Sequence, residues 1–121
     1  MTARVAALAA LLALAACKKQ EAPQSDRPSP IGATERKRGE DACATYLEKV
    51  CACAKVKTDK PDLAKRCDLD KALIDALNLA LGVDDNPTAT AADVWRAQDQ
   101  ARKIMASCVQ SVNELAGLGC P

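Results

Sequence analysis

Seven cysteines in a chain of 121 residues constrain this protein more than any other feature of its sequence. A cysteine content this high in a short chain is typical of proteins that fold in an oxidising compartment and are stabilised by disulfides. The sequence also contains no histidine. It therefore excludes Ser-His and Cys-His nucleophile pairs, His-ligated catalytic zinc and haem attachment through Cys-x-x-Cys-His.

Residues 1–16 have the pattern of a signal peptide. A short segment with one positive charge, Arg4, precedes ten apolar residues from Val5 to Leu14. This run is too short to span a bilayer, which needs ~20 apolar residues. Small residues and a cysteine end the segment in the order Leu14-Ala15-Ala16-Cys17.

These four residues resemble the lipobox of bacterial lipoproteins, in which Leu, a small residue, Ala or Gly, and Cys follow the apolar run. The resemblance implies cleavage between Ala16 and Cys17, a diacylglyceryl group on the Cys17 sulfur, and a further acyl chain such as palmitate on its amino group. Lys18 replaces the Asp that marks inner-membrane retention in enteric bacteria. The resemblance thus implies the outer membrane, facing the periplasm or the cell surface. The alternative is an ordinary cleaved signal peptide, with Cys17 as a structural cysteine.

Residues 17–39 are predicted to form the lipidated cysteine and a flexible tether. The tether contains three prolines and only one large apolar residue, Ile31, so it cannot bury enough surface to offset the entropy of ordering. Residues 18–39 carry six basic and three acidic side chains, whereas residues 40–121 carry ten basic and thirteen acidic ones. The basic tether is either a solubilising spacer or a segment attracted to anionic lipid head groups.

Residues 40–121 are predicted to form a small all-α domain of three helices, stapled by up to three disulfides. Helix-forming residues dominate this part, and β-branched residues are sparse. The first helix is expected over about 39–56. The second is expected to begin after Asp59, with Pro61 in its first turn, and to end near Leu81 before Gly82. The third is expected to begin at a cap on Thr90 and to end near residue 116.

The third predicted helix has the clearest amphipathic pattern. One face carries apolar residues at helical spacing, with Ile104 beside them, namely Val94, Ala101, Met105, Cys108, Val112 and Leu115. Residues 40–121 contain only 20 large apolar side chains. A domain of this size buries too little surface to be stable by its core alone, so covalent support is expected.

Six cysteines remain after Cys17, an even number that can pair completely. The disulfide candidates are Cys43, Cys51, Cys53, Cys67, Cys108 and Cys120. Fifteen pairings exist, and at ~100° per residue Cys43 and Cys51 are expected on one face of the first helix and Cys53 on another. If the third helix runs antiparallel to the first, the pairs are Cys43–Cys120, Cys51–Cys108 and Cys53–Cys67. A strict up-down-up bundle makes these helices parallel, and this connectivity then fails.

The sequence Cys51-Ala52-Cys53 also admits a thiol–disulfide or metal-thiolate function. However, the pair lies near the C-terminal end of the predicted helix, where the helix dipole disfavours a thiolate. A second short-spaced pair that would complete four ligands is absent from the sequence. We therefore predict structural disulfides, and the alternative is a redox or metal-binding function. We predict no metal site, no cofactor and no catalytic residue.

Trp95, the only tryptophan, lies at the edge of the apolar face of the third helix. It is expected either to cover loop residues such as Val83 and Pro87 or to be an exposed anchor for a partner. The preceding residues, Asp84-Asp85-Asn86, lack the ligand spacing of a calcium-binding loop and predict a solvated turn.

The sequence thus predicts a membrane-anchored lipoprotein that acts as a structural or protein-interaction module. Its expected partners are the lipid bilayer, through acylated Cys17, and a protein that the sequence does not identify. The net charge of +1 does not favour nucleic-acid binding. The alternative function is that of a periplasmic thiol-disulfide or metal-handling protein that uses Cys51 and Cys53.

Overall fold

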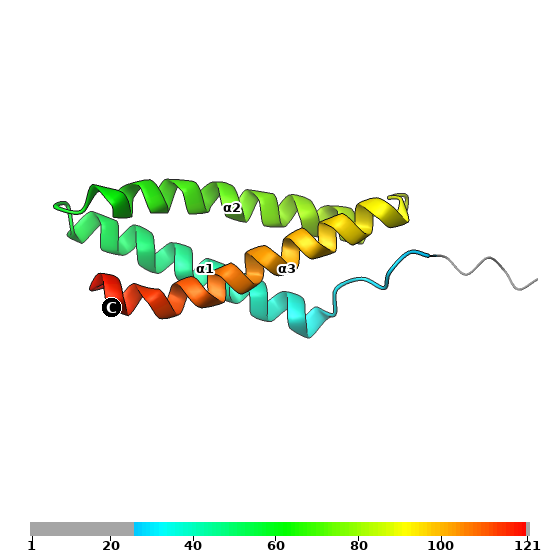
Figure 1. Ribbon diagram of the computed structural model, residues 1–121, viewed down its shortest axis with the longest axis horizontal. Coiled ribbons are helices and arrows are strands. Elements are labelled where there is room, and N and C mark those ends of the chain that lie inside the picture. Colours follow the sequence, from blue (N-terminus) through cyan, green and yellow to red (C-terminus); the bar gives the residue numbers. More distant parts are fainter. Residues whose placement is uncertain (1–25, 121) are drawn as a thin grey trace, which may run out of the picture.

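The computed structural model describes residues 26–120, which form an up-down-up bundle of three helices (Figure 1). Helix α1 spans Ala33–Val56, α2 spans Pro61–Asp85 and α3 spans Ala91–Glu114. A short 3-10 helix, η1 (Leu115–Leu118), follows α3 directly. Helices α1 and α3 run in the same direction, and α2 runs against both. The prediction of a three-helix all-α domain is confirmed.

Local sequence signals explain where α2 and α3 begin and where the chain turns after η1. Pro61 occupies the first turn of α2, where its missing N–H has no helical partner to lose. At α3, the Thr90 hydroxyl accepts a hydrogen bond from the Asp93 backbone N–H (3.2 Å) and donates one to the Asp93 carboxylate (2.6 Å). Gly119 ends η1 in the left-handed region, with φ of 74°, which glycine adopts without a steric cost.

Two helix boundaries differ from the prediction. Helix α1 begins at Ala33, so residues 33–39, which we expected in the tether, are helical. Contacts distant in sequence stabilise this first turn, because Arg36 pairs with Asp85 (2.8 Å) and Glu35 pairs with Arg102 (2.8 Å). Helix α2 continues through Gly82 to Asp85, since core packing of its last turns outweighs the low helix propensity of glycine, which costs ~1 kcal/mol.

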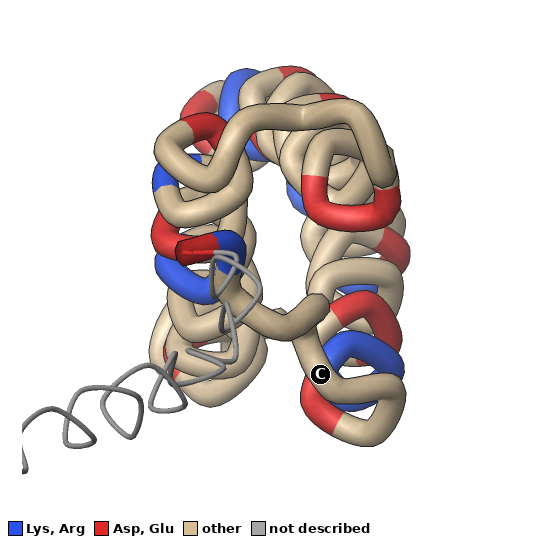
Figure 2. The backbone as a smooth tube through the Cα atoms, turned by 90° about the vertical axis from the view of Figure 1, so that its right-hand side faces the viewer, with Lys and Arg blue, Asp and Glu red and all other residues tan. Residues whose placement is uncertain are grey.

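The core runs along the bundle axis in two clusters. Residues of both charge signs are spread along the helices (Figure 2). The first cluster joins all three helices and includes Leu77, Leu81, Ala101 and Met105. The second lies around Tyr46, Val50, Leu63 and Leu115. The apolar face predicted for α3 faces this core. Within residues 26–120, the hydropathy of the helices is too low for any of them to cross a membrane.

Helices α1 and α3 approach closely at Gly39, and this contact gives a stability prediction. A Cβ atom at position 39 would overlap the side chain of Met105, including the Met105 Cβ atom. That atom cannot move unless the backbone of α3 shifts. We expect Gly39→Ala to lower the free energy of unfolding by about 1–3 kcal/mol, as for other overpacked cores. Gly82→Ala is the matched control, because a Cβ there meets nothing within 4 Å.

The control variant should gain about 1 kcal/mol from the higher helix propensity of Ala. Urea denaturation of the two variants beside the parent protein measures both effects. Equal stability of the two variants would contradict the close approach of α1 and α3.

Candidate functional site

All six cysteines of the helical domain are in disulfides. The pairs are Cys43–Cys108, Cys51–Cys67 and Cys53–Cys120, with Cα–Cα distances of 4.8, 4.9 and 5.7 Å respectively. None of the three pairings that we expected for an antiparallel third helix occurs. Helices α1 and α3 are parallel, so cysteines early in α1 meet α3 and the later Cys53 meets the chain beyond it.

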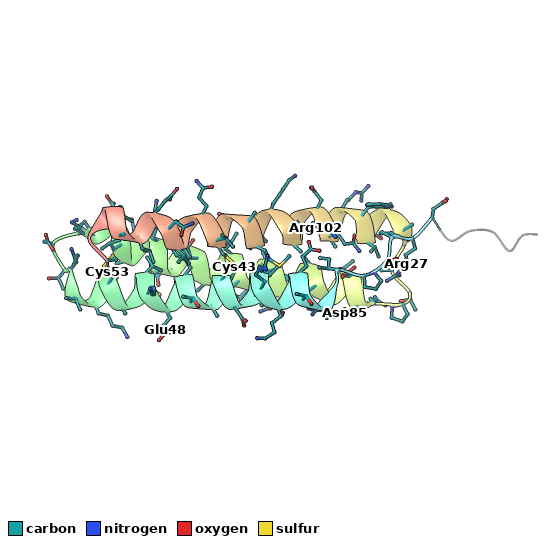
Figure 3. All side chains as sticks on the ribbon, turned by 90° about the horizontal axis from the view of Figure 1, so that it is seen from below. Arg27, Cys43, Glu48, Cys53, Asp85 and Arg102 are labelled. Carbon is teal, nitrogen blue, oxygen red and sulfur yellow. A yellow bond between two sulfur atoms is a disulfide. The ribbon has the colours of Figure 1, made fainter. Side chains whose placement is uncertain are left out.

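The disulfides share one arrangement, because each has one cysteine in α1. Cys51 links α1 to α2, Cys43 links it to α3, and Cys53 links it to the chain after η1. Cys43 lies near the middle of the bundle, and Cys53 lies near the end that carries the turn between α1 and α2 (Figure 3). The helix that continues from the N-terminal segment is thus covalently joined to α2, to α3 and to the chain after η1.

The Cys51-Ala52-Cys53 segment does not form a dithiol pair with itself, since its two cysteines bond to different parts of the chain. The expected separation of Cys51 from Cys53 around α1 agrees with these bonds. The expectation that Cys43 and Cys51 share one face is wrong, because Cys43 bonds to α3 and Cys51 bonds to α2. Among residues 26–120, histidine, cysteine and carboxylate side chains do not gather into a group of three or more that would hold a metal ion.

The segment of residues 26–32, which we call the strap, crosses the end of the bundle next to the α2–α3 loop. Ile31 of the strap is buried in the core. The Arg27 guanidinium donates hydrogen bonds to the backbone carbonyls of Ala89 (2.9 Å) and Asp84 (3.1 Å), near the C-terminal end of α2. Part of the predicted flexible tether is therefore a fixed component of the domain.

Two buried polar side chains hold the strap. Asp84 is 1% exposed and Gln98 is 2% exposed. The Asp84 carboxylate accepts hydrogen bonds from the Ile31 backbone N–H (2.9 Å) and from the Gln98 amide (2.8 Å). The same amide also donates to the Ser29 carbonyl (2.8 Å). The strap, α2 and α3 thus meet in one hydrogen-bonded network.

The prediction of a solvated turn at Asp84-Asp85-Asn86 is wrong for Asp84, which lies buried in the last turn of α2. Asp84, Gln98 and Arg27 are the residues that sequence reasoning missed. No signal in the sequence indicated them, because the second helix was expected to end near Leu81, before Asp84 and Asp85. In the structure both stand in the last turn of α2, where the helix dipole disfavours negative charge and no basic residue shares the turn. Such a local conflict indicates compensation from elsewhere in the fold.

Trp95 lies beside the strap, on α3. Its side chain is 56% exposed, and its indole N–H donates to the backbone carbonyl of Asp26 (3.4 Å). This exposure does not agree with a shielded lid over Val83 and Pro87. The role of Trp95 as an anchor for a partner stays a prediction.

Tyr46 is the only tyrosine, and it is buried in the second core cluster. Burial raises the pKa of its hydroxyl above the ordinary value, and the carboxylate of Asp70 raises this pKa further. The hydroxyl therefore stays protonated at neutral pH. We assign Tyr46 a packing role between α1, α2 and α3.

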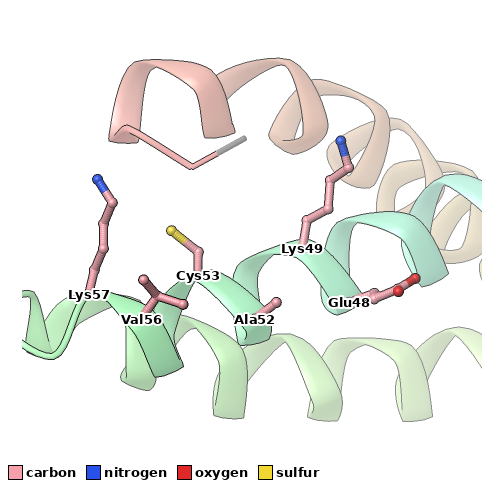
Figure 4. A pocket seen from close by; sticks show the side chains of 6 residues that line it. All are labelled: Glu48, Lys49, Ala52, Cys53, Val56 and Lys57. Carbon is pink, nitrogen blue, oxygen red and sulfur yellow. The ribbon is translucent and has the colours of Figure 1, made fainter.

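Two hollows lie at the end of the bundle opposite the strap. One, of about 330 Å³, is lined by residues from the end of α1 and by Lys57, which follows it, namely Glu48, Lys49, Ala52, Cys53, Val56 and Lys57 (Figure 4). The second, of about 400 Å³, is formed by the α1–α2 turn, the first turns of α2 and Leu118 of η1. Val56, at the rim of the first hollow, is 82% exposed. This end combines an open apolar surface with flanking lysines.

Cys17 and Ala16, the predicted lipidation and cleavage residues, lie outside the described residues. No known protein family matches the chain, and the comparisons with curated proteins and with solved structures give no match either.

Proposed function

We propose that this chain is a lipid-anchored envelope protein whose helical domain is a rigid structural and protein-interaction module. One observation carries the proposal, namely that each of the three disulfides of the domain joins α1 to another part of the chain. Helix α1 continues directly from the segment that leads back to Cys17. A pull on the N-terminus therefore reaches α2, α3 and the C-terminal end through covalent bonds.

Two features support the proposed cellular location, namely the disulfides and the lipobox resemblance. Three disulfides in one small domain indicate an oxidising compartment outside the cytoplasm. Acyl chains on Cys17 would hold the protein on a membrane, because two or three chains give durable anchoring where one chain binds only marginally. Lys18 after the cysteine favours the outer membrane.

The end opposite the strap is the surface that we assign to a protein partner. The strap fixes the entry of the tether at the α2–α3 end, so the two hollows lie at the other end of helices of about 36 Å, the length of 24 residues. The exposed side chain of Val56 and the apolar wall of the first hollow offer area for burial.

Cys17→Ser tests the anchor. The variant lacks the thiol that would carry the diacylglyceryl group, so we expect it to leave the membrane fraction or to accumulate as an unprocessed precursor. Lys18→Ala is the matched control, because it changes the neighbouring residue and keeps the cysteine; it should stay with the membranes. A processed Cys17→Ser protein that fractionates with membranes as the parent does would show that the lipid anchor is wrong.

Site-specific crosslinking in the native cell tests the partner surface. A photoreactive residue at position 56 should give a discrete crosslinked species, whereas the same residue at exposed position 75 on α2 should not. Mass spectrometry of the excised species identifies the captured protein. Equal crosslinking from both positions, or none from position 56, would contradict the assignment of this end.

A further inference from the structure

The only tryptophan of the chain, Trp95, lies next to Asp26, the first residue of the strap. The indole N–H of Trp95 donates to the carbonyl of Asp26, so the polar edge of the ring already has a partner within the protein. More than half of the side chain is nevertheless exposed. The residue thus presents ring surface beyond this hydrogen bond to the solvent, at the bundle end that carries the strap.

The distance along the chain from Trp95 to the anchor is short. Asp26 follows Cys17 by only nine residues, which span at most about 30 Å when fully extended. A chain of that length keeps the strap end at a high effective concentration near any surface that holds Cys17. At that effective concentration, even a weak contact between this end and the surface is formed much of the time.

The charges around Trp95 indicate which kind of surface it fits. Arg96 pairs with Asp93 (3.6 Å), Arg102 pairs with Glu35 (2.8 Å) and Lys103 pairs with Asp99 (2.6 Å). Each of these three cations has an anionic neighbour, and Arg27 of the strap donates to backbone carbonyls, so the described residues of this face do not form a cluster of cations that would select anionic lipids. An exposed indole with its N–H satisfied suits the boundary between head groups and acyl chains, where tryptophan is enriched.

We propose that Trp95 is a membrane-interface contact, which rests the strap end of the domain on the same phospholipid bilayer that holds the acyl chains of Cys17. This inference rests on the proposed lipid anchor. It adds an orientation, in which Trp95 faces the bilayer and the hollow around Val56 faces away from it.

Fluorescence quenching tests the contact, since Trp95 is the only tryptophan. The full-length lipidated protein is reconstituted into phosphatidylcholine vesicles whose acyl chains carry bromine close to the head group. Emission should fall about twofold relative to vesicles without bromine, because an interfacial indole lies within contact range of the quencher. These lipids are zwitterionic, so attraction to anionic head groups does not contribute.

A second variant reports on the opposite end. Trp95→Phe combined with Val56→Trp moves the only tryptophan to a position that is 82% exposed, and its emission should be nearly the same in both kinds of vesicle. Both substitutions are at exposed positions, so the fold is expected to persist. Binding of each protein to vesicles is measured separately by flotation.

The outcomes separate the two proposals. A protein that floats with the vesicles and shows no quenching of Trp95 overturns the membrane contact and leaves the anchor intact. Equal quenching of Trp95 and of the tryptophan at position 56 also overturns it, because the orientation is then absent. A protein that fails to float overturns the lipid anchor itself.

Discussion

Loss of the Cys43–Cys108 disulfide should lower the free energy of unfolding by about 4 kcal/mol. The bond closes a loop of 65 residues, and the chain-entropy relation gives about this value for such a loop. The Cys43→Ala, Cys108→Ala double variant measures the effect without a reductant. Both positions are buried, so the variant also loses packing in the first core cluster.

The Cys51→Ala, Cys67→Ala double variant is the matched comparison, because its loop closes only 16 residues and is worth about 3 kcal/mol by the same relation. Full reduction breaks all three disulfides. Their summed stabilisation exceeds about 5 kcal/mol, which is the lower end of the free energy of unfolding for native proteins. We therefore expect the fully reduced domain to be unfolded at room temperature. An unchanged thermal midpoint after verified reduction would contradict a structural role for the disulfides.

Asp84→Ala should cost about 3 kcal/mol. The substitution removes the buried carboxylate that accepts from the Ile31 N–H and from the Gln98 amide. It leaves the buried Ile31 N–H without its acceptor, and the Gln98 amide keeps only the Ser29 carbonyl. Hydrogen bonds to charged groups contribute about 1.5–3 kcal/mol each, and buried donors that lose their acceptor incur a desolvation penalty. The strap should detach, so the exchange of the Ile31 amide with solvent should become fast.

Asp85→Ala is the control for this variant. Asp85 is the next residue in the chain and pairs with Arg36, but its side chain is 53% exposed. Exposed ion pairs contribute about 0–1 kcal/mol, so the control should be nearly as stable as the parent. Chemical denaturation and hydrogen exchange measure both variants. Losses of equal size for Asp84→Ala and Asp85→Ala would contradict the buried network.

The sequence was sufficient to predict the features that depend on local residue patterns, namely a buried helix face and the starts of two helices. The spacing of apolar residues predicted the buried face of α3, and Thr90 and Pro61 predicted where helices begin. These features follow from helix periodicity and from the hydrogen-bonding needs of helix ends. They act over a few residues, so a single sequence contains them.

The disulfide pairing illustrates why tertiary arrangement was harder to predict. At ~100° per residue, Cys51 and Cys53 lie about 80° on either side of Cys43 around α1. Cys43 is thus equally placed to share a neighbour with Cys51 or with Cys53, and helical geometry does not choose between them. The direction of α3 relative to α1 decides, and we expected the antiparallel arrangement where the structure has the parallel one.

The strap was unpredictable for a related reason. Its order depends on one buried side chain, Ile31, and on partners more than fifty residues away in the sequence, such as Asp84. Composition alone indicates a flexible segment, because prolines and polar residues dominate. Specific hydrogen bonds from Arg27 and to Asp84 override that tendency here.

One peptide map tests the central claim. The claim is that the chain is acylated and that disulfides link α1 to α2, to α3 and to the C-terminal end. The protein is extracted from membranes without reductant and cut with trypsin and a Glu-specific protease, which separate Cys108 from Cys120 at Glu114. The account predicts peptide 41–48 linked to 104–114, and a three-peptide species of 50–55, 67–71 and 115–121. It also predicts acyl chains on the peptide that begins at Cys17. Peptide 41–48 linked to 115–121, or an unmodified Cys17, would contradict it.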